Sequence, residues 1–80
     1  MENAEIYREF TKIFHQVFDN ESIVVRPDLT ANDVEEWDSL SHIRLVLTVE
    51  KVFGVKFSAS EIGKLKNVEG LVDLVRLKAK

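Results

Sequence analysis

Ser39 and His42 are the two side chains whose types and spacing most directly suggest chemistry. They stand three residues apart, so on a helix they would share one face, as a nucleophile and its general base do in some hydrolases. Spacing is the only support for this interpretation. No glycine-rich turn surrounds the serine, no acid stands where it would orient the imidazole, and 80 residues leave little room for a substrate pocket. We therefore predict no enzyme and assign no catalytic residue.

The loop before Ser39 offers a second candidate, a calcium site. Positions one, three, five and nine of a twelve-residue calcium loop would be Asp28, Thr30, Asn32 and Glu36. Position six is Asp33 instead of glycine, and position twelve is Ser39 instead of glutamate. Because the sharp turn and the bidentate ligand are both missing, we expect no dedicated metal site.

Composition limits the class of protein further. A chain of 80 residues with 45% hydrophobic content can form one compact core, so residues 1–80 are predicted to form a single domain. A net charge of -3 argues against a nucleic-acid partner. The chain has no cysteine, which excludes disulfides, thiolate zinc sites and cysteine nucleophiles. Any thiol chemistry must come from an attached group.

The sequence shows neither a secretory signal nor an apolar stretch of transmembrane length. We therefore expect a cytoplasmic protein without a membrane partner. We also expect it to act as a monomer.

Apolar periodicity predicts the elements that must position Ser39. A first helix, from about residue 3 to about residue 18, is predicted by a stripe at three- and four-residue steps, made of Ile6, Phe10, Ile13, Phe14, Val17 and Phe18. A long loop with few obvious core anchors follows over residues 20–38, and we expect its apolar run at 23–25 to be loop residues held against the core. A second helix is predicted from Ser39 to about Phe53, because Asp38 and Ser39 suit its cap and Gly54 suits its end.

Two further helices complete the predicted fold. Ser58 followed by Glu61 is typical of a capping box and predicts a short helix that ends near Gly63. Asn67 suits the cap of a last helix, whose predicted core stripe is Val68, Leu71, Val72, Leu74 and Val75. We predict an all-α four-helix bundle, with three longer helices and one short helix.

Residues 36–40 read Glu-Trp-Asp-Ser-Leu, residues 50–55 read Glu-Lys-Val-Phe-Gly-Val, and residues 67–69 read Asn-Val-Glu. In this combination and order, over nearly the whole chain, the sequence resembles the acyl carrier protein family. The resemblance implies that a phosphopantetheinyl transferase attaches 4'-phosphopantetheine to Ser39. The arm would then carry an acyl or aminoacyl group as a thioester. Without the resemblance, Asp38 and Ser39 can be interpreted as a helix cap and nothing more.

Partners of such a carrier would be the transferase and enzymes that load and process the acyl group, through transient contacts. The resemblance implies that the second helix docks them. The implied docking residues are Asp38, Leu40, Ile43, Arg44, Val46, Leu47 and Glu50. The apolar members Val46 and Leu47 could equally belong to the core. Residues 21–38 hold six acids and one base, a net charge of -5, which we interpret as either a docking patch or a solvated loop.

The second helix departs from the pattern of fatty-acid carriers, which commonly keep carboxylates along it. Here Ser41, Arg44 and Lys51 stand on that helix, and Glu50 is its only acid. Trp37 is also unusual before the Asp-Ser pair. Both features favour a specialised polyketide, secondary-metabolite or cell-surface pathway over housekeeping fatty-acid synthesis, which is the alternative.

Three questions stay open at this level. Trp37 could close over the core or influence the choice of cargo, and these roles are compatible. The cargo could lie between the second and third helices or remain exposed. An unmodified helical interaction module is the competing class of protein.

Overall fold

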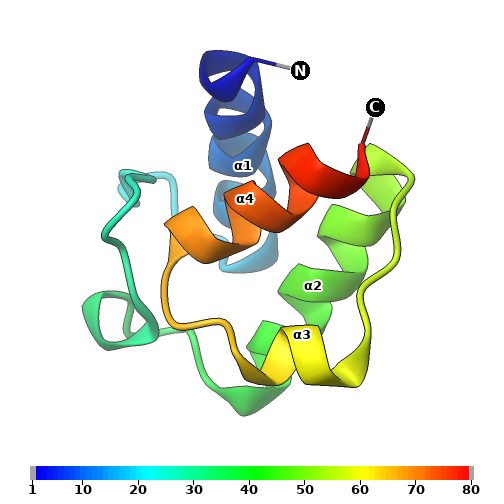
Figure 1. Ribbon diagram of the computed structural model, residues 1–80. Coiled ribbons are helices and arrows are strands. Elements are labelled where there is room, and N and C mark those ends of the chain that lie inside the picture. The colour runs from blue at the N-terminus through cyan, green and yellow to red at the C-terminus, as the bar shows by residue number, and fades with distance from the viewer. Residues whose placement is uncertain (1, 80) are drawn as a thin grey trace.

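The computed structural model describes residues 2–79, and within them the chain forms four α-helices and one 3₁₀ turn, with no strand. Figure 1 shows α1, α2 and α4 arranged around the core, with the short α3 near the start of α2. The elements are α1 (Asn3–Val17), the 3₁₀ turn (Ala31–Asp33), α2 (Ser39–Phe53), α3 (Ala59–Gly63) and α4 (Val68–Lys78). The predicted all-α bundle with one short helix is confirmed.

Aromatic side chains of α1 form the centre of the core. Phe10 and Phe14 are fully buried, with ring centroids 6.4 Å apart, and Phe14 meets Phe18 edge to face at 5.4 Å. α1 packs against both α2 and α4. The buried apolar residues are Ile6, Phe10, Ile13, Phe14, Phe18, Leu29, Val34, Leu45, Val46, Val49, Val55, Phe57, Val68, Leu71, Val72 and Val75. Val17 and Leu74, predicted for the core stripes, are only partly buried.

Local capping contacts define where the last three helices begin. Asp38 Oδ1 accepts the Ser41 amide at 2.9 Å before α2, and Ser58 and Glu61 form a capping box before α3. Asn67 Oδ1 accepts the Gly70 amide at 3.0 Å before α4. These side chains satisfy amides that the first turn of a helix cannot pair internally, so the sequence alone could predict them.

The long loop after α1 is anchored more firmly than its sequence suggests. Leu29 and Val34 are buried, whereas few anchors were expected in this loop. The Leu29 carbonyl accepts the Val68 amide at 2.9 Å, and the Pro27 carbonyl accepts the Glu69 amide at 3.0 Å. Unpaired amides at the start of α4 therefore fix the loop to that helix. This contact spans about forty residues of chain, which is why local periodicity could not predict it.

The apolar run in the first part of the loop behaves partly as predicted. Ile23 and Val25 pack partly buried against the core, while Val24 points outward and is 70% exposed. None of the helices within residues 2–79 is long and apolar enough to cross a membrane.

Gly54 ends α2 in the left-handed conformation, at φ 67°, with open space where a Cβ would stand. Gly54→Ala should lower the free energy of unfolding by about 1 kcal/mol, because side chains disfavour this backbone region. Urea denaturation measures the change. Gly63→Ala is the matched control, since Gly63 also faces open space but lies inside α3 without a positive φ. Equal losses in both variants would contradict the conformational explanation.

Candidate functional site

Ser39 is the first residue of α2, and its side chain is exposed. The helix is capped by its neighbours: Asp38 Oδ1 accepts the Ser41 amide, and Ser41 Oγ in turn accepts the Asp38 amide at 2.8 Å. Ser41 Oγ also donates to the Glu36 carbonyl at 2.8 Å. Among the described residues, no hydrogen bond involves the Ser39 hydroxyl. Asp38 and Ser41 therefore perform the capping, and Ser39 keeps a hydroxyl that the fold does not use.

Asp38 places a carboxylate next to that hydroxyl. The hydrogen bond from the Ser41 backbone, with a smaller contribution from the Ser41 hydroxyl, lowers the pKa of Asp38 below its ordinary value. Asp38 is exposed, so a partner can reach its carboxylate. Asp38 is thus ionised at neutral pH beside Ser39.

A groove of about 430 Å³ opens beside Ser39. One wall comes from the start of α2 and the residue before its cap, and the other comes from the 3₁₀ turn, the α3–α4 loop and α4. Its lining residues are Ala31, Trp37, Asp38, Ser39, His42, Leu65, Lys66, Asn67 and Leu71. Sequence reasoning missed Ala31, Leu65 and Leu71 as walls of a site. The isolated apolar Leu65 between Lys64 and Lys66 was the signal that could have suggested one.

Trp37 both covers the core and faces this groove. Its ring meets Phe14 edge to face at 5.4 Å and lies 5.9 Å from the Phe18 ring. Its indole Nε1 donates to His42 Nδ1 at 3.0 Å. Closing over the core is therefore one role of Trp37, and its place in the groove wall leaves the second predicted role open.

His42 is held as a neutral imidazole by this contact. Because Nδ1 accepts from Trp37, the ring proton must sit on Nε2. Burial also lowers the pKa of His42. Within residues 2–79 no hydrogen bond joins His42 to Ser39, and its accepting nitrogen already has a partner. The arrangement therefore does not make a nucleophile and base.

The structure divides the predicted docking residues into an exposed group, described first, and a group with contacts inside the protein. Leu40, Ile43 and Leu47 are 72%, 55% and 58% exposed, and Arg44 is exposed as well.

Val46 differs from the docking prediction, because its side chain is only 2% exposed and packs in the core. Glu50 is half-buried, and its Oε2 accepts the Phe57 amide at 2.7 Å, so this carboxylate braces the chain after α2. Helical periodicity alone did not separate these two residues from the exposed group.

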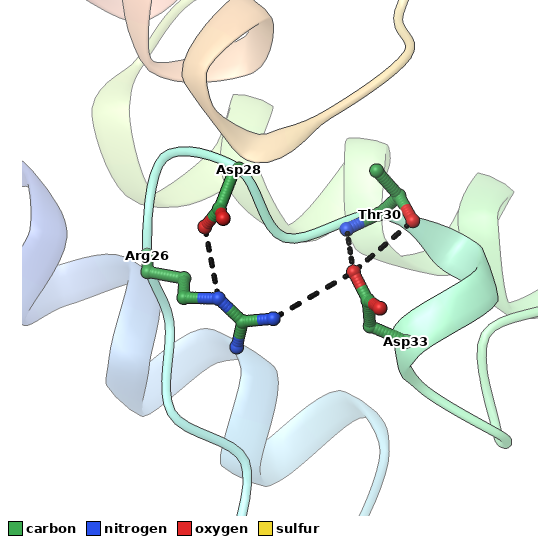
Figure 2. A network of polar contacts seen from close by, with 4 residues as sticks. All are labelled: Arg26, Asp28, Thr30 and Asp33. Carbon is green, nitrogen blue, oxygen red and sulfur yellow. Dashed lines mark hydrogen bonds and ion pairs between the residues drawn. The ribbon is translucent and has the colours of Figure 1, made fainter.

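Part of the loop's negative charge is compensated internally. Figure 2 shows Arg26 between two of the acids: its Nε lies 2.8 Å from Asp28 Oδ1, and its Nη2 lies 3.8 Å from Asp33 Oδ2. The same Asp33 oxygen accepts from the amide and hydroxyl of Thr30 at 3.0 and 3.2 Å. Two calcium-ligand candidates, Asp28 and Thr30, are thus engaged within the loop. In the part of the chain described, no group of three His, Asp or Glu side chains could hold a metal ion.

Comparison with known proteins finds similar acyl carrier proteins. No protein-family model matches the chain. An acyl carrier protein of Coprothermobacter proteolyticus is 35% identical over 77 residues, covering 94% of this chain and 92% of the relative. One of Myxococcus xanthus is 30% identical over 71 residues, covering 89% and 90%. The solution NMR structure of holo acyl carrier protein from Geobacter metallireducens matches with a TM-score of 0.85 at 47% identity, covering 90% of this chain and 83% of that one.

The fold and these relatives define a small helical carrier. The chain belongs to the acyl carrier protein family. Acyl carrier proteins are carriers and not enzymes, so the predictions of family and of a non-catalytic protein are confirmed.

The lowered pKa of His42 predicts a pH-dependent stability. The unfolded chain takes up the imidazole proton near pH 6.5, whereas the folded protein resists it, so the free energy of unfolding should fall as pH drops below about 6.5. Urea denaturation at pH 7.5 and 5.5 measures this loss. His42→Gln keeps an acceptor for Trp37 but cannot titrate, and should show a smaller loss. An NMR titration placing the His42 pKa at or above 6.5 would contradict the argument.

Proposed function

We propose that residues 1–80 form one carrier domain that bears 4'-phosphopantetheine on Ser39 and carries acyl or aminoacyl groups as thioesters. The observation that carries this proposal is the Ser39 hydroxyl, which is exposed on the first turn of α2 and has no hydrogen-bond partner among residues 2–79, while Asp38 and Ser41 cap the helix. A serine needed only as a cap would accept an amide of that turn. Modification of Ser39 can therefore leave the helix start intact.

The residues around Ser39 fit a phosphodiester. The start of α2 presents the positive end of the helix dipole, which favours an anion there. The arm would supply the thiol that this cysteine-free chain lacks. The chain's own part is to hold the attachment point on a rigid helix end and to leave it accessible.

The groove beside Ser39 offers shelter for the arm or a short cargo. Its volume of about 430 Å³ lies in the range of small-molecule sites, and Ser39 is one of its lining residues. The apolar lining residues Trp37, Leu65 and Leu71 suit apolar groups. This location, between the start of α2 and the α3–α4 loop, differs from the space between the second and third helices considered from the sequence.

The pathway we propose is a specialised one, in polyketide, secondary-metabolite or cell-surface synthesis in the cytoplasm. The exposed face of α2 carries Arg44 and Lys51, whereas its single acid, Glu50, is engaged with Phe57. Such a helix is a poor match for enzymes that recognise carboxylates along it. Housekeeping fatty-acid synthesis is the alternative.

Attachment at Ser39 is tested by intact mass. The protein should gain one phosphopantetheine mass after incubation with coenzyme A, magnesium and a broad-specificity phosphopantetheinyl transferase. Ser39→Ala should gain none while keeping its circular dichroism spectrum, because the fold does not use the hydroxyl. No gain with several active transferases would favour an unmodified interaction module instead.

Asp38 can be tested separately as a cap and as a charge. Asn caps helices about as well as Asp, so Asp38→Asn should keep the free energy of unfolding within a few tenths of a kcal/mol, whereas Asp38→Ala should lose about 1 kcal/mol. If the transferase uses the carboxylate, both variants should be modified about tenfold more slowly at limiting enzyme. Wild-type rates in Asp38→Asn would restrict Asp38 to capping.

A further inference from the structure

The imidazole of His42 has one ring nitrogen that the fold does not use. Its Nδ1 accepts the indole N–H of Trp37 at 3.0 Å, so the ring proton lies on Nε2. Within residues 2–79 this N–H has no hydrogen-bond partner, and no side-chain nitrogen there that lacks a partner is fully buried. His42 Nε2–H is therefore a donor that a ligand can reach.

Trp37 fixes the position of this donor. The indole ring meets the ring of the buried Phe14 edge to face at 5.4 Å and lies 5.9 Å from the Phe18 ring. The indole and imidazole ring centroids are 6.0 Å apart. His42 can turn its ring away only by losing its hydrogen bond to Trp37. A donor held in this way loses little conformational freedom when it binds a ligand.

Helical spacing places the donor one turn after Ser39. Residues three apart on a helix share a face, with about 5–6 Å between their Cβ atoms. Both Ser39 and His42 line the groove of about 430 Å³. In an arm attached to the Ser39 hydroxyl, the phosphate comes first and the amides lie further from the helix. The phosphate is therefore the part of the arm nearest to His42.

The other wall of the groove supplies a positive charge. Lys66, in the loop between α3 and α4, is the only base among the lining residues, and it forms no ion pair within the described part of the chain. The residues after it are fixed, because Asn67 Oδ1 accepts the Gly70 amide at 3.0 Å and the Leu29 carbonyl accepts the Val68 amide at 2.9 Å. The backbone next to Lys66 is thus anchored beside the groove.

Attachment of a phosphodiester changes the charge balance of the groove. Asp38 and Lys66 are its charged lining residues, so their charges cancel before attachment. The phosphodiester adds one negative charge next to the Asp38 carboxylate, and like charges at short range repel each other. Lys66 can offset this charge directly, and His42 can offset it with a charge-assisted hydrogen bond.

We propose that His42 and Lys66 bind the phosphate of the attached arm from the two walls of the groove. His42 Nε2–H donates to a phosphate oxygen, and the Lys66 ammonium pairs with the phosphate charge. This inference rests on the proposed attachment at Ser39. Both are positioning residues: they hold the base of the arm over the groove and set the direction in which it leaves α2, while the thiol end stays free to move.

NMR titration of the apo and holo proteins tests the His42 contact. The holo protein is prepared with coenzyme A and a transferase, and its mass is checked before use. A phosphate oxygen at Nε2 stabilises the charged imidazole, so the pKa of His42 should be higher in the holo protein than in the apo protein. The phosphorus-31 resonance should shift with the same midpoint, because a phosphodiester does not itself titrate near neutral pH.

His15 is the internal control in the same spectra. It is the second of the two histidines in the chain, lies on α1, and has its Nε2 2.9 Å from the Ile23 carbonyl oxygen. It does not line the groove. The pKa of His15 should therefore be the same in the apo and holo proteins.

Lys66→Gln tests the other half of the contact. Loss of the ammonium should make the phosphate more mobile, so the phosphorus-31 line of the holo protein should become narrower than in wild type. Lys64→Gln is the matched control, since Lys64 is exposed like Lys66 and forms no ion pair among residues 2–79, but does not line the groove. Its line width should equal that of wild type.

Three results would overturn the inference. An equal pKa of His42 in the apo and holo proteins would remove the His42 contact. An unchanged line in Lys66→Gln would remove the Lys66 contact, and equal narrowing in Lys64→Gln would indicate a general charge effect. A holo protein with these results keeps the proposed carrier function. A wild-type protein that gains no phosphopantetheine loses that function itself.

Discussion

Asp38 and Ser41 exchange hydrogen bonds across the first turn of α2, and each satisfies a backbone amide of the other. Because of this reciprocal cap, the helix start does not depend on the side chain of Ser39. Ser39 can then stand on rigid backbone with a hydroxyl that is exposed and without an internal partner among the described residues. Had Ser39 been the cap, a bulky substituent on its oxygen would have removed an acceptor from the turn it must rest on. Because Asp38 and Ser41 do the capping, the backbone at Ser39 is rigid and the Ser39 hydroxyl stays available for reaction.

The two faces of α2 differ: one packs in the core and the other is exposed to solvent. Leu45, Val46 and Val49 supply the contacts with the core, so the outer face is free of a structural role. Exposed leucines there contribute little to folding, since their apolar surface stays in water. Gly54 and the hydrogen bond from Phe57 to Glu50 fix the far end of the same helix, so both faces keep a constant orientation relative to the bundle.

Local chemistry made much of this structure predictable. Caps at Asp38, Ser58 and Asn67 and the stop at Gly54 depend on neighbours within four residues, and the sequence alone located them. Features that depend on contacts between distant residues could not be predicted from the sequence in this way. Burial of Leu29 requires the first amides of α4, and the pairing of Trp37 with His42 requires the loop to close over Phe14. Val46 was implied as a docking residue by the resemblance and could equally belong to the core, because periodicity alone does not say which apolar side of a helix faces the core; the structure buries it.

The acidic loop illustrates how structure changes the meaning of a charge count. Residues 21–38 carry a net charge of -5, yet Arg26 draws two of the acids, Asp28 and Asp33, into a network that braces the loop. These two carboxylates stabilise the loop, and the positive charge of Arg26 compensates part of their negative charge. The acids just before Ser39 are Glu35, Glu36 and Asp38, which are exposed and form no ion pair among the described residues. Negative potential is therefore concentrated at the attachment point, while the outer face of α2 is positive. Screening limits such fields to about 8–10 Å at physiological salt, so each acts only close to the surface that carries it.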